Sequence, residues 1–160
     1  MKYSKSKTKH EGVEPRLQYA ALPWRIRDAR LEIMLVSSRE TRRWVIPKGW
    51  PMKGRKPYTT AAIEALQEAG LLGKIDKTPI GAFHYQKRLR NGATFVCRVD
   101  VFPLRVARQR KTWPEKSQRS TKWFERVEAA RLVQEPELAE LIEGFASADA
   151  REGKPPSAGA

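Results

Sequence analysis

The segment between Pro57 and Gly70 limits the possible folds of this chain more than any other part of it. Proline is favoured at the start of a helix and glycine just after its end, so this pair predicts a helix over residues 58–69. One side of that helix carries small residues, namely Ala61, Ala62, Ala65 and Ala69. Small side chains allow close approach, so we expect this helix to pack on a β-sheet.

Strands that would form such a sheet are predicted on both sides of the helix. Apolar and alternating runs favour strands over 17–26, 31–37, 43–46, 79–86 and 94–106, with Asp28-Ala29-Arg30 as the turn between the first two. Two more helices are predicted over 126–133 and 136–146. Strands, a helix, further strands and terminal helices indicate an α+β or α/β/α layered domain.

A chain of 160 residues has the size of one domain. We expect that domain over residues 15–146, between a Lys-rich flexible tail at 1–14 and a second flexible tail at 147–160. The sequence contains no run of 18 apolar residues and begins without the apolar stretch of a signal peptide. One cysteine, Cys97, cannot form an internal disulfide. These features argue against secreted and membrane-spanning classes and predict a cytoplasmic protein.

The charge of the chain is large and unevenly distributed. Lys and Arg number 32 against 18 Asp and Glu, a formal net charge of +14. The excess is concentrated in residues 39–56 and 84–122, whereas 125–143 are acidic. An anionic partner is therefore expected. The distribution favours a local binding site for the phosphates of a small molecule, with RNA as a further candidate partner and no membrane partner.

Glu64 and Glu68 are the first candidate site residues. They stand four residues apart and share one face of the predicted helix, with Gln67 beside them and the alanines opposite. Two carboxylates at this spacing repel each other, whereas Mg²⁺ binds one or two carboxylates together with water and substrate phosphates. Most pairs of this kind belong to a solvated helix face, so the spacing alone is weak evidence.

The surrounding segment resembles the sequence box of the Nudix hydrolases, which runs Gly, five residues, Glu, seven residues, Arg-Glu-apolar-x-Glu-Glu-x-Gly-apolar. The residues in register with it are Gly49, Glu64, Ala65, Glu68, Gly70 and Leu71. Outside the box, residues 37–39, 44–47, 81–83 and 122–124 are similar to the diphosphoinositol and diadenosine polyphosphate hydrolase branch. The resemblance covers residues 17–146 and implies an α+β fold, an α/β/α sandwich with a mixed β-sheet between helices.

The same resemblance implies a metal site. Glu64 and Glu68 would ligate Mg²⁺ or Mn²⁺ together with the backbone carbonyl of Gly49. The catalytic group would then consist of Glu64, Gln67 and Glu68.

Three box positions depart from the family pattern. Arg55 replaces the first Glu and Ile63 replaces the Arg, and these two positions commonly pair to brace the loop against the helix. Because both are replaced, neither charge is left without its partner. Gln67 stands where several relatives carry the general base, and an amide cannot take a proton from water. Glu125 and Glu128 are alternative bases.

Basic residues form the candidate phosphate site. In the resembling branch, phosphates are bound by residues before the box and on later strands, and Arg39, Arg88 and Arg119 stand at matching places. Guanidinium groups bind phosphate oxygens through two parallel hydrogen bonds. Lys48 and Lys53 would add positive charge. The alternative for each of them is a solvated surface position.

The leading functional hypothesis is a Mg²⁺-dependent phosphohydrolase that cleaves a diphosphate linkage in a dinucleoside polyphosphate or a diphosphoinositol polyphosphate. A second hypothesis, motivated by Gln67, is a catalytically weakened binding module for polyphosphate, nucleotide or RNA. A third is hydrolysis of 5′ triphosphates or caps on RNA.

Overall fold

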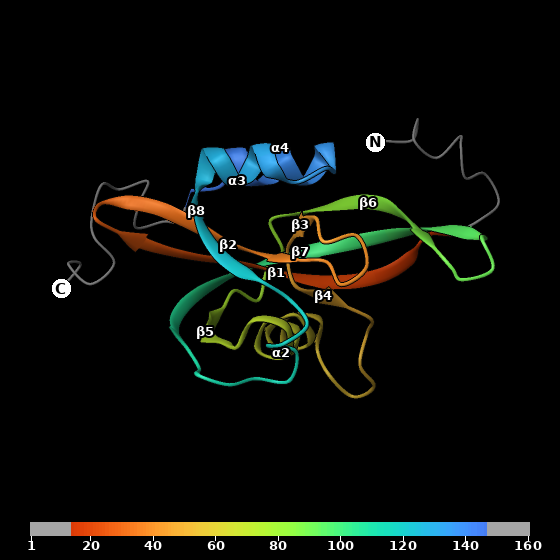
Figure 1. The fold of residues 1–160 in the computed structure, drawn as a ribbon, viewed down its shortest axis with the longest axis horizontal. Coiled ribbons are helices and arrows are strands. Elements are labelled where there is room, and N and C mark those ends of the chain that lie inside the picture. The colour runs from red at the N-terminus through yellow and green to blue at the C-terminus, as the bar shows by residue number, and fades with distance from the viewer. Residues whose placement is uncertain (1–13, 147–160) are drawn as a thin grey trace.

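The computed structural model describes residues 14–146, and these residues form one eight-stranded sheet with three helices packed on it (Figure 1). The elements follow in the order β1 (Arg16–Arg27), β2 (Arg30–Ser37), β3 (Trp44–Val45), β4 (Lys48–Gly49), α2 (Pro57–Ala69), β5 (Leu71–Ile75), β6 (Gly81–Arg88), β7 (Thr94–Gln109), β8 (Thr121–Glu125), α3 (Arg126–Leu132) and α4 (Pro136–Gly144). The two expected tails, 1–14 and 147–160, lie outside the described residues apart from Glu14.

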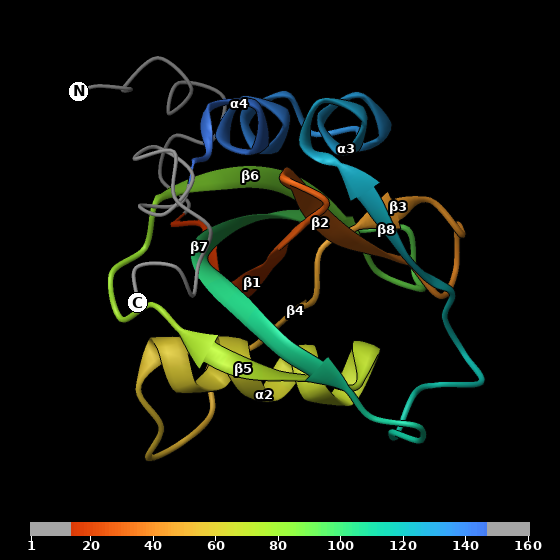
Figure 2. The same cartoon turned by 90° about the vertical axis from the view of Figure 1, so that its left-hand side faces the viewer.

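The sheet is mixed, because β1 and β7 run parallel while the other paired strands are antiparallel. Its main order is β3-β2-β1-β7-β5, and β4, β6 and β8 pair with β1, β7 and β2 respectively. Helix α2 covers one face, and α3 and α4 cover the other (Figure 2). This arrangement confirms the predicted α+β class, an α/β/α sandwich with a mixed sheet between helices.

Strand alternation sends apolar side chains to both faces of the sheet. Val99 and Val101 of β7 join the core under α3 and α4, which also contains Leu138 and Ile142. Phe102 and Leu104 of the same strand join the core under α2, together with Ala61, Ala65 and Ala69. The expected packing of the alanines on the sheet is therefore confirmed for three of them, whereas Ala62 is only half-buried.

Three strands were not expected from the sequence, and one of them, β8, pairs with β2 from Glu32 opposite Glu125 to Val36 opposite Thr121. β4 contains only Lys48 and Gly49 and pairs with Tyr19 and Ala20 of β1. β5 follows α2 directly and pairs with the far end of β7, from Leu71 opposite Gln109 onward. Neither β4 nor β5 has a run of alternating residues, so each forms a strand because it pairs with β1 or β7. This pairing also extends β7 beyond the predicted end at residue 106.

The other boundaries differ from the expected ones by a few residues. β6 covers 81–88 instead of 79–86, and α4 ends at Gly144 instead of 146. The turn between β1 and β2 is present, with Asp28 and Ala29 at positive φ, but Arg30 already belongs to β2 and lies opposite Arg27.

Helix α2 ends at Gly70, as its sequence predicts. Gly70 has a φ of 69°, and its backbone N–H donates to the carbonyl of Leu66 at 2.9 Å. Left-handed backbone of this kind favours glycine at the end of a helix. The Trp113 ring lies so close that a Cβ on residue 70 would overlap it. Glycine is therefore required both by the backbone and by the packing of Trp113 on the helix end.

Substitution Gly70→Ala should lower the free energy of unfolding by about 2–4 kcal/mol, because a left-handed residue with a Cβ costs about 1–2 kcal/mol and Trp113 must also move. Gly54→Ala is the matched control, since Gly54 has a φ of 77° but no atom within 4 Å of its added Cβ. Urea denaturation of both variants separates backbone strain from packing. Equal losses in the two variants would contradict a packing role for Trp113.

Candidate functional site

The carboxylates of Glu64 and Glu68 lie together on the side of α2 that faces β4. Glu64 is half-buried, and Glu68 is only 6% exposed. The two carboxyl groups are close enough for the charge of Glu64 to raise the pKa of Glu68. The expected pairing on one helix face is therefore present, but Glu68 is buried beside the alanines and does not lie on a solvated face.

Gly49 allows Glu64 to reach the backbone of β4. A Cβ on Gly49 would overlap the carboxylate of Glu64, so any other residue here would push that carboxylate away. β4 itself is held by β1, where Gly49 lies opposite Tyr19. The structure thus brings together Gly49, Glu64 and Glu68, the three residues for which metal binding was expected.

Burial strongly affects the charges of this group. Burial raises the pKa of Glu68 to about 8, against the opposing effect of Arg119 and Lys48. It also raises the pKa of Glu64. Burial lowers the pKa of the Lys48 ammonium, while Glu68 acts in the opposite direction. A buried carboxylate is unfavourable without a proton or a cation beside it. One more positive charge at this site would therefore stabilise the ionised carboxylates.

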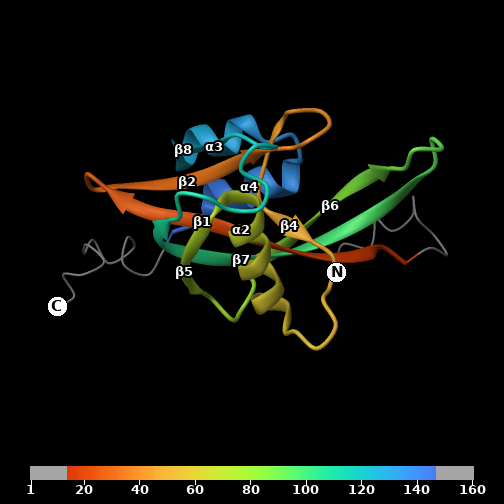
Figure 3. The ribbon, with the colours of Figure 1, turned by 60° about the horizontal axis from the view of Figure 1, so that its bottom comes forward.

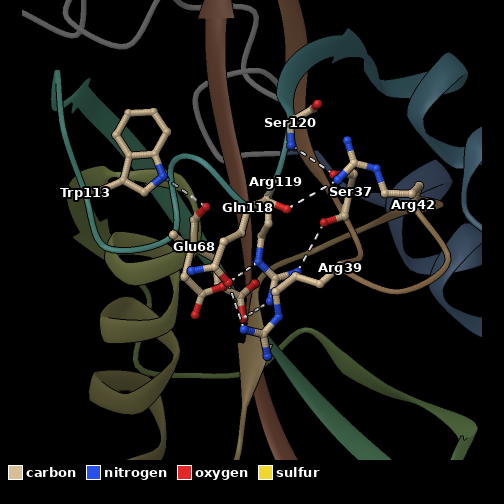
Figure 4. A network of polar contacts seen from close by, with 9 residues as sticks. Ser37, Arg39, Arg42, Glu68, Trp113, Gln118, Arg119 and Ser120 are labelled. Carbon is tan, nitrogen blue, oxygen red and sulfur yellow. Dashed lines mark hydrogen bonds and ion pairs between the residues drawn. The ribbon is translucent and has the colours of Figure 1, made fainter.

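Arg119 is the guanidinium nearest to Glu68, and it is only 11% exposed (Figure 4). Its Nη2 lies 3.5 Å from Oε2 of Glu68. Its Nε donates to Oε1 of Glu115 at 2.7 Å, and its Nη1 donates to the carbonyl of Ser37 at 3.1 Å. Arg119 is thus at the site, as expected, and protein groups already hold it in place.

The loop over residues 110–120 binds the last turn of α2. The indole N–H of Trp113 donates to the carbonyl of Glu68 at 3.2 Å, and the backbone N–H of Glu115 donates to the carbonyl of Gln67 at 3.0 Å. Carbonyls at a helix end lack partners within the helix. This loop supplies them. At the two box positions expected to pair as a brace, Arg55 is exposed and Ile63 is half-buried. The hydrogen bonds from the loop hold the end of α2 in this chain.

Glu115 is a site residue that the sequence analysis did not identify. Its charge raises the pKa of both Glu64 and Glu68, and its carboxylate holds Arg119. One feature of the sequence could have pointed to it: Glu115 is the one acidic residue between 101 and 124, and it stands four positions before Arg119. The two alternative bases lie elsewhere, since Glu125 pairs with Arg30 and Glu128 is exposed on α3. Helix α3 covers the opposite face of the sheet from α2 (Figure 2).

The remaining candidate phosphate ligands lie at different distances from this group. Arg39 follows β2 and donates to the side-chain oxygen of Gln118 at 2.9 Å, so it contacts the loop over residues 110–120 near Arg119 (Figure 4). Lys53 is exposed in the loop between β4 and α2. Arg88 is exposed at the last position of β6. The structure brings Lys48 and Arg119 to the carboxylates, with Arg39 behind them.

The donor set suits a hard divalent cation. Two carboxylates and a backbone carbonyl are oxygen ligands of the kind that Mg²⁺ and Mn²⁺ prefer. Over residues 14–146, no group of three or more His, Cys, Asp or Glu residues gathers as a metal cage. A cation held by two carboxylates and one carbonyl would keep its remaining positions for water and substrate phosphates, which is the usual arrangement for Mg²⁺ in phosphoryl-transfer sites.

The raised pKa of Glu68 predicts how stability depends on pH without metal. A carboxyl with a raised pKa stabilises the fold fully below its ordinary pKa of 4.5, and that stabilisation is lost as the pH rises through about 8. Thermal denaturation between pH 5 and 9 should show the wild type losing stability relative to Glu68→Gln, and Mg²⁺ should restore it at pH 9. Glu128→Gln, at an exposed position, should follow the wild type. Parallel curves for wild type and Glu68→Gln would contradict this assignment.

Comparisons with known proteins agree with this geometry. Nudix hydrolase 12, mitochondrial, from Arabidopsis thaliana is 27% identical over 119 residues, which cover 72% of this chain and 59% of that protein. Diphosphoinositol polyphosphate phosphohydrolase 3-alpha from Mus musculus is 32% identical over 117 residues, which cover 70% of this chain and 67% of that protein. The crystal structure of C. elegans Ap4A hydrolase superposes with a TM-score of 0.59 at 16% identity, over 81% of this chain and 95% of that one.

No family model matches the chain. The chain spans 59%, 57% and 64% of the length of three Arabidopsis relatives that it matches. Over residues 14–146, no helix is long and apolar enough to cross a membrane. The box residues meet at one site, the sheet and helices form the expected sandwich, and the mouse relative is similar over two thirds of its length, so the chain belongs to the Nudix hydrolase family.

Proposed function

We propose that this protein is a Mg²⁺- or Mn²⁺-dependent phosphohydrolase that cleaves a diphosphate linkage in a highly anionic substrate. The observation that carries the proposal is the buried pair of Glu64 and Glu68 against Gly49, with Lys48 and Arg119 beside it. The candidate substrates are dinucleoside polyphosphates and diphosphoinositol polyphosphates. Their support comes from the similar mouse phosphohydrolase and from the fold shared with an Ap4A hydrolase.

Glu64, Glu68 and the carbonyl of Gly49 would hold the cation. When bound, a divalent cation neutralises charge on phosphoryl oxygens and lowers the pKa of a bound water. Lys48 and Arg119 would contribute the positive charge that the protein itself supplies to those oxygens. Because both side chains are largely buried, their interactions with phosphate would be stronger than at a solvated surface.

Glu115 is our candidate for the general base that position 67 lacks. In hydrolysis the oxygen of water forms a bond to one phosphorus, the anhydride oxygen leaves with the other phosphate, and the water proton needs an acceptor. Gln67 cannot accept it. Glu115 is anchored to the carbonyl of Gln67 by its own backbone N–H and oriented by Arg119, so it can take over the role.

The second candidate function is a binding module for polyphosphate, nucleotide or RNA that turns its ligand over slowly. The amide at Gln67 and the net charge of +14 favour it. Binding without turnover that weakens steeply with salt would support this function. RNA 5′ triphosphates and caps are further compounds to be tested as substrates.

The single cysteine, Cys97, is a buried free thiol, which supports a reducing compartment such as the cytoplasm.

Removal of either carboxylate should abolish most of the activity. Glu64→Gln and Glu68→Gln are each expected to lower kcat at least 100-fold in Mg²⁺, measured as formation of mononucleotides from diadenosine tetraphosphate and as phosphate release from a diphosphoinositol polyphosphate. Both variants should also bind Mn²⁺ more weakly by electron paramagnetic resonance. Glu128→Gln is the control and should keep wild-type activity. A wild type that forms neither nucleotide products nor phosphate from any compound would overturn the proposed function.

The role of Glu115 can be tested against position 67. Glu115→Gln should lower kcat by about 10²–10⁴-fold, the usual contribution of a general base, with a smaller change in KM. Gln67→Glu in the Glu115→Gln background should restore part of the rate, because it returns a carboxylate to the family position. Full activity in Glu115→Gln would exclude Glu115 as the base, and the pH profile of kcat then identifies whether another carboxylate acts.

A further inference from the structure

The sheet face that α3 and α4 cover continues beyond these helices along the β6–β7 hairpin (Figures 1 and 3). Phe95, Cys97 and Val99 alternate onto this face of β7, and Val99 belongs to the core under α3 and α4. Opposite them on β6, Lys87 pairs with Phe95 and Tyr85 pairs with Cys97. Residues of an antiparallel pair share a face. Among residues 14–146, the part of this face that α3 and α4 leave uncovered therefore carries Phe95 and Lys87.

Trp50 meets this surface from the end of β4. It is 42% exposed, and its ring centroid lies 6.2 Å from that of Phe95 with an interplanar angle of 39°. On Phe95, the guanidinium carbon of Arg16 lies 3.8 Å from the ring centroid. We call Trp50, Phe95 and Arg16 the aromatic platform. A large indole left open to water beside a stacked cation suggests a surface for a ligand.

The aromatic platform begins one residue from the candidate metal site. Trp50 follows Gly49, and Gly49 is the residue on whose backbone the carboxylate of Glu64 lies. The preceding residue, Lys48, interacts electrostatically with Glu68 and places its Nζ 5.2 Å from the ring centroid of Tyr85. Lys48 thus lies between the carboxylates and the uncovered sheet face. A ligand whose phosphates lie at the carboxylates would extend toward the platform.

We propose that the aromatic platform stacks the flat base of a nucleoside polyphosphate whose diphosphate lies at Glu64 and Glu68. This inference rests on the proposed function and selects one of its two substrate classes. A base has a π-face that an indole ring can cover. A diphosphoinositol polyphosphate has a saturated ring with phosphates around it, and an indole offers no partner for those groups. Trp50 therefore favours a nucleotide substrate.

Equilibrium binding tests the proposal without turnover. The probes are a methylene-bridged analogue of diadenosine tetraphosphate, inorganic tripolyphosphate and inositol hexakisphosphate, measured by calorimetry in Mg²⁺. Base–aromatic stacking is worth about 1–3 kcal/mol per base, which is about 5- to 150-fold in affinity. Trp50→Ala should weaken binding of the dinucleotide analogue by such a factor and change tripolyphosphate binding less than twofold. Trp50→Phe, which keeps an aromatic ring, should recover most of the affinity.

Val127→Ala is the matched control, since Val127 is similarly exposed, at 45%, but lies on α3. It should leave all three affinities unchanged. Equal losses for the dinucleotide analogue and tripolyphosphate in Trp50→Ala, or unchanged affinity for both, would overturn the inference. So would tighter binding of inositol hexakisphosphate than of the dinucleotide analogue by the wild type. Failure of the proposed function is distinguishable, because it appears as absent hydrolysis of every substrate while these binding measurements remain readable.

Discussion

The buried carboxylate of Glu68 is the constraint around which the site is organised. An ionised carboxylate inside a protein is unfavourable by several kcal/mol unless a proton or cation accompanies it. Two groups meet this need, Lys48 from β4 and Arg119 from the loop before β8, whereas the charge of Glu64 on the same helix raises the pKa of Glu68 further. The site therefore exists only when three parts of the chain, distant in sequence, meet above the sheet.

The loop over residues 110–120 explains how this chain differs from its family and keeps the site. Arg55 and Ile63 stand at the two box positions for which the family resemblance implies a bracing pair, and in this chain the loop contacts the end of α2. Trp113 and Glu115 hold the last turn of α2 through its carbonyls, while Arg119 holds Glu68 itself. One loop therefore orders the helix end, neutralises a buried charge and brings a third carboxylate to the site.

In the structure, several of the chain's basic residues lie close to the candidate site. Lys48, Arg119 and Arg39 lie beside or behind the two carboxylates, and Arg16 stacks on Phe95 at the uncovered sheet face. The acidic residues at 125–143 belong largely to α3 and α4, on the other side of the sheet from α2. Positive charge beside the helix that carries the candidate metal ligands supports a local phosphate site more than an extended nucleic-acid surface.

Local patterns were enough to predict helix α2, the faces of β7 and the shared position of Glu64 and Glu68. These features repeat every 3.6 or two residues, so the sequence by itself determined them. β4, β5 and the membership of Glu115 in the site depended on contacts between distant segments. The same holds for the burial of Glu68 and the exposure of Trp50, whose neighbours come from other strands and loops. Only the tertiary structure decided these, because burial and charge pairing depend on which segments meet and not on the residues adjacent in the chain.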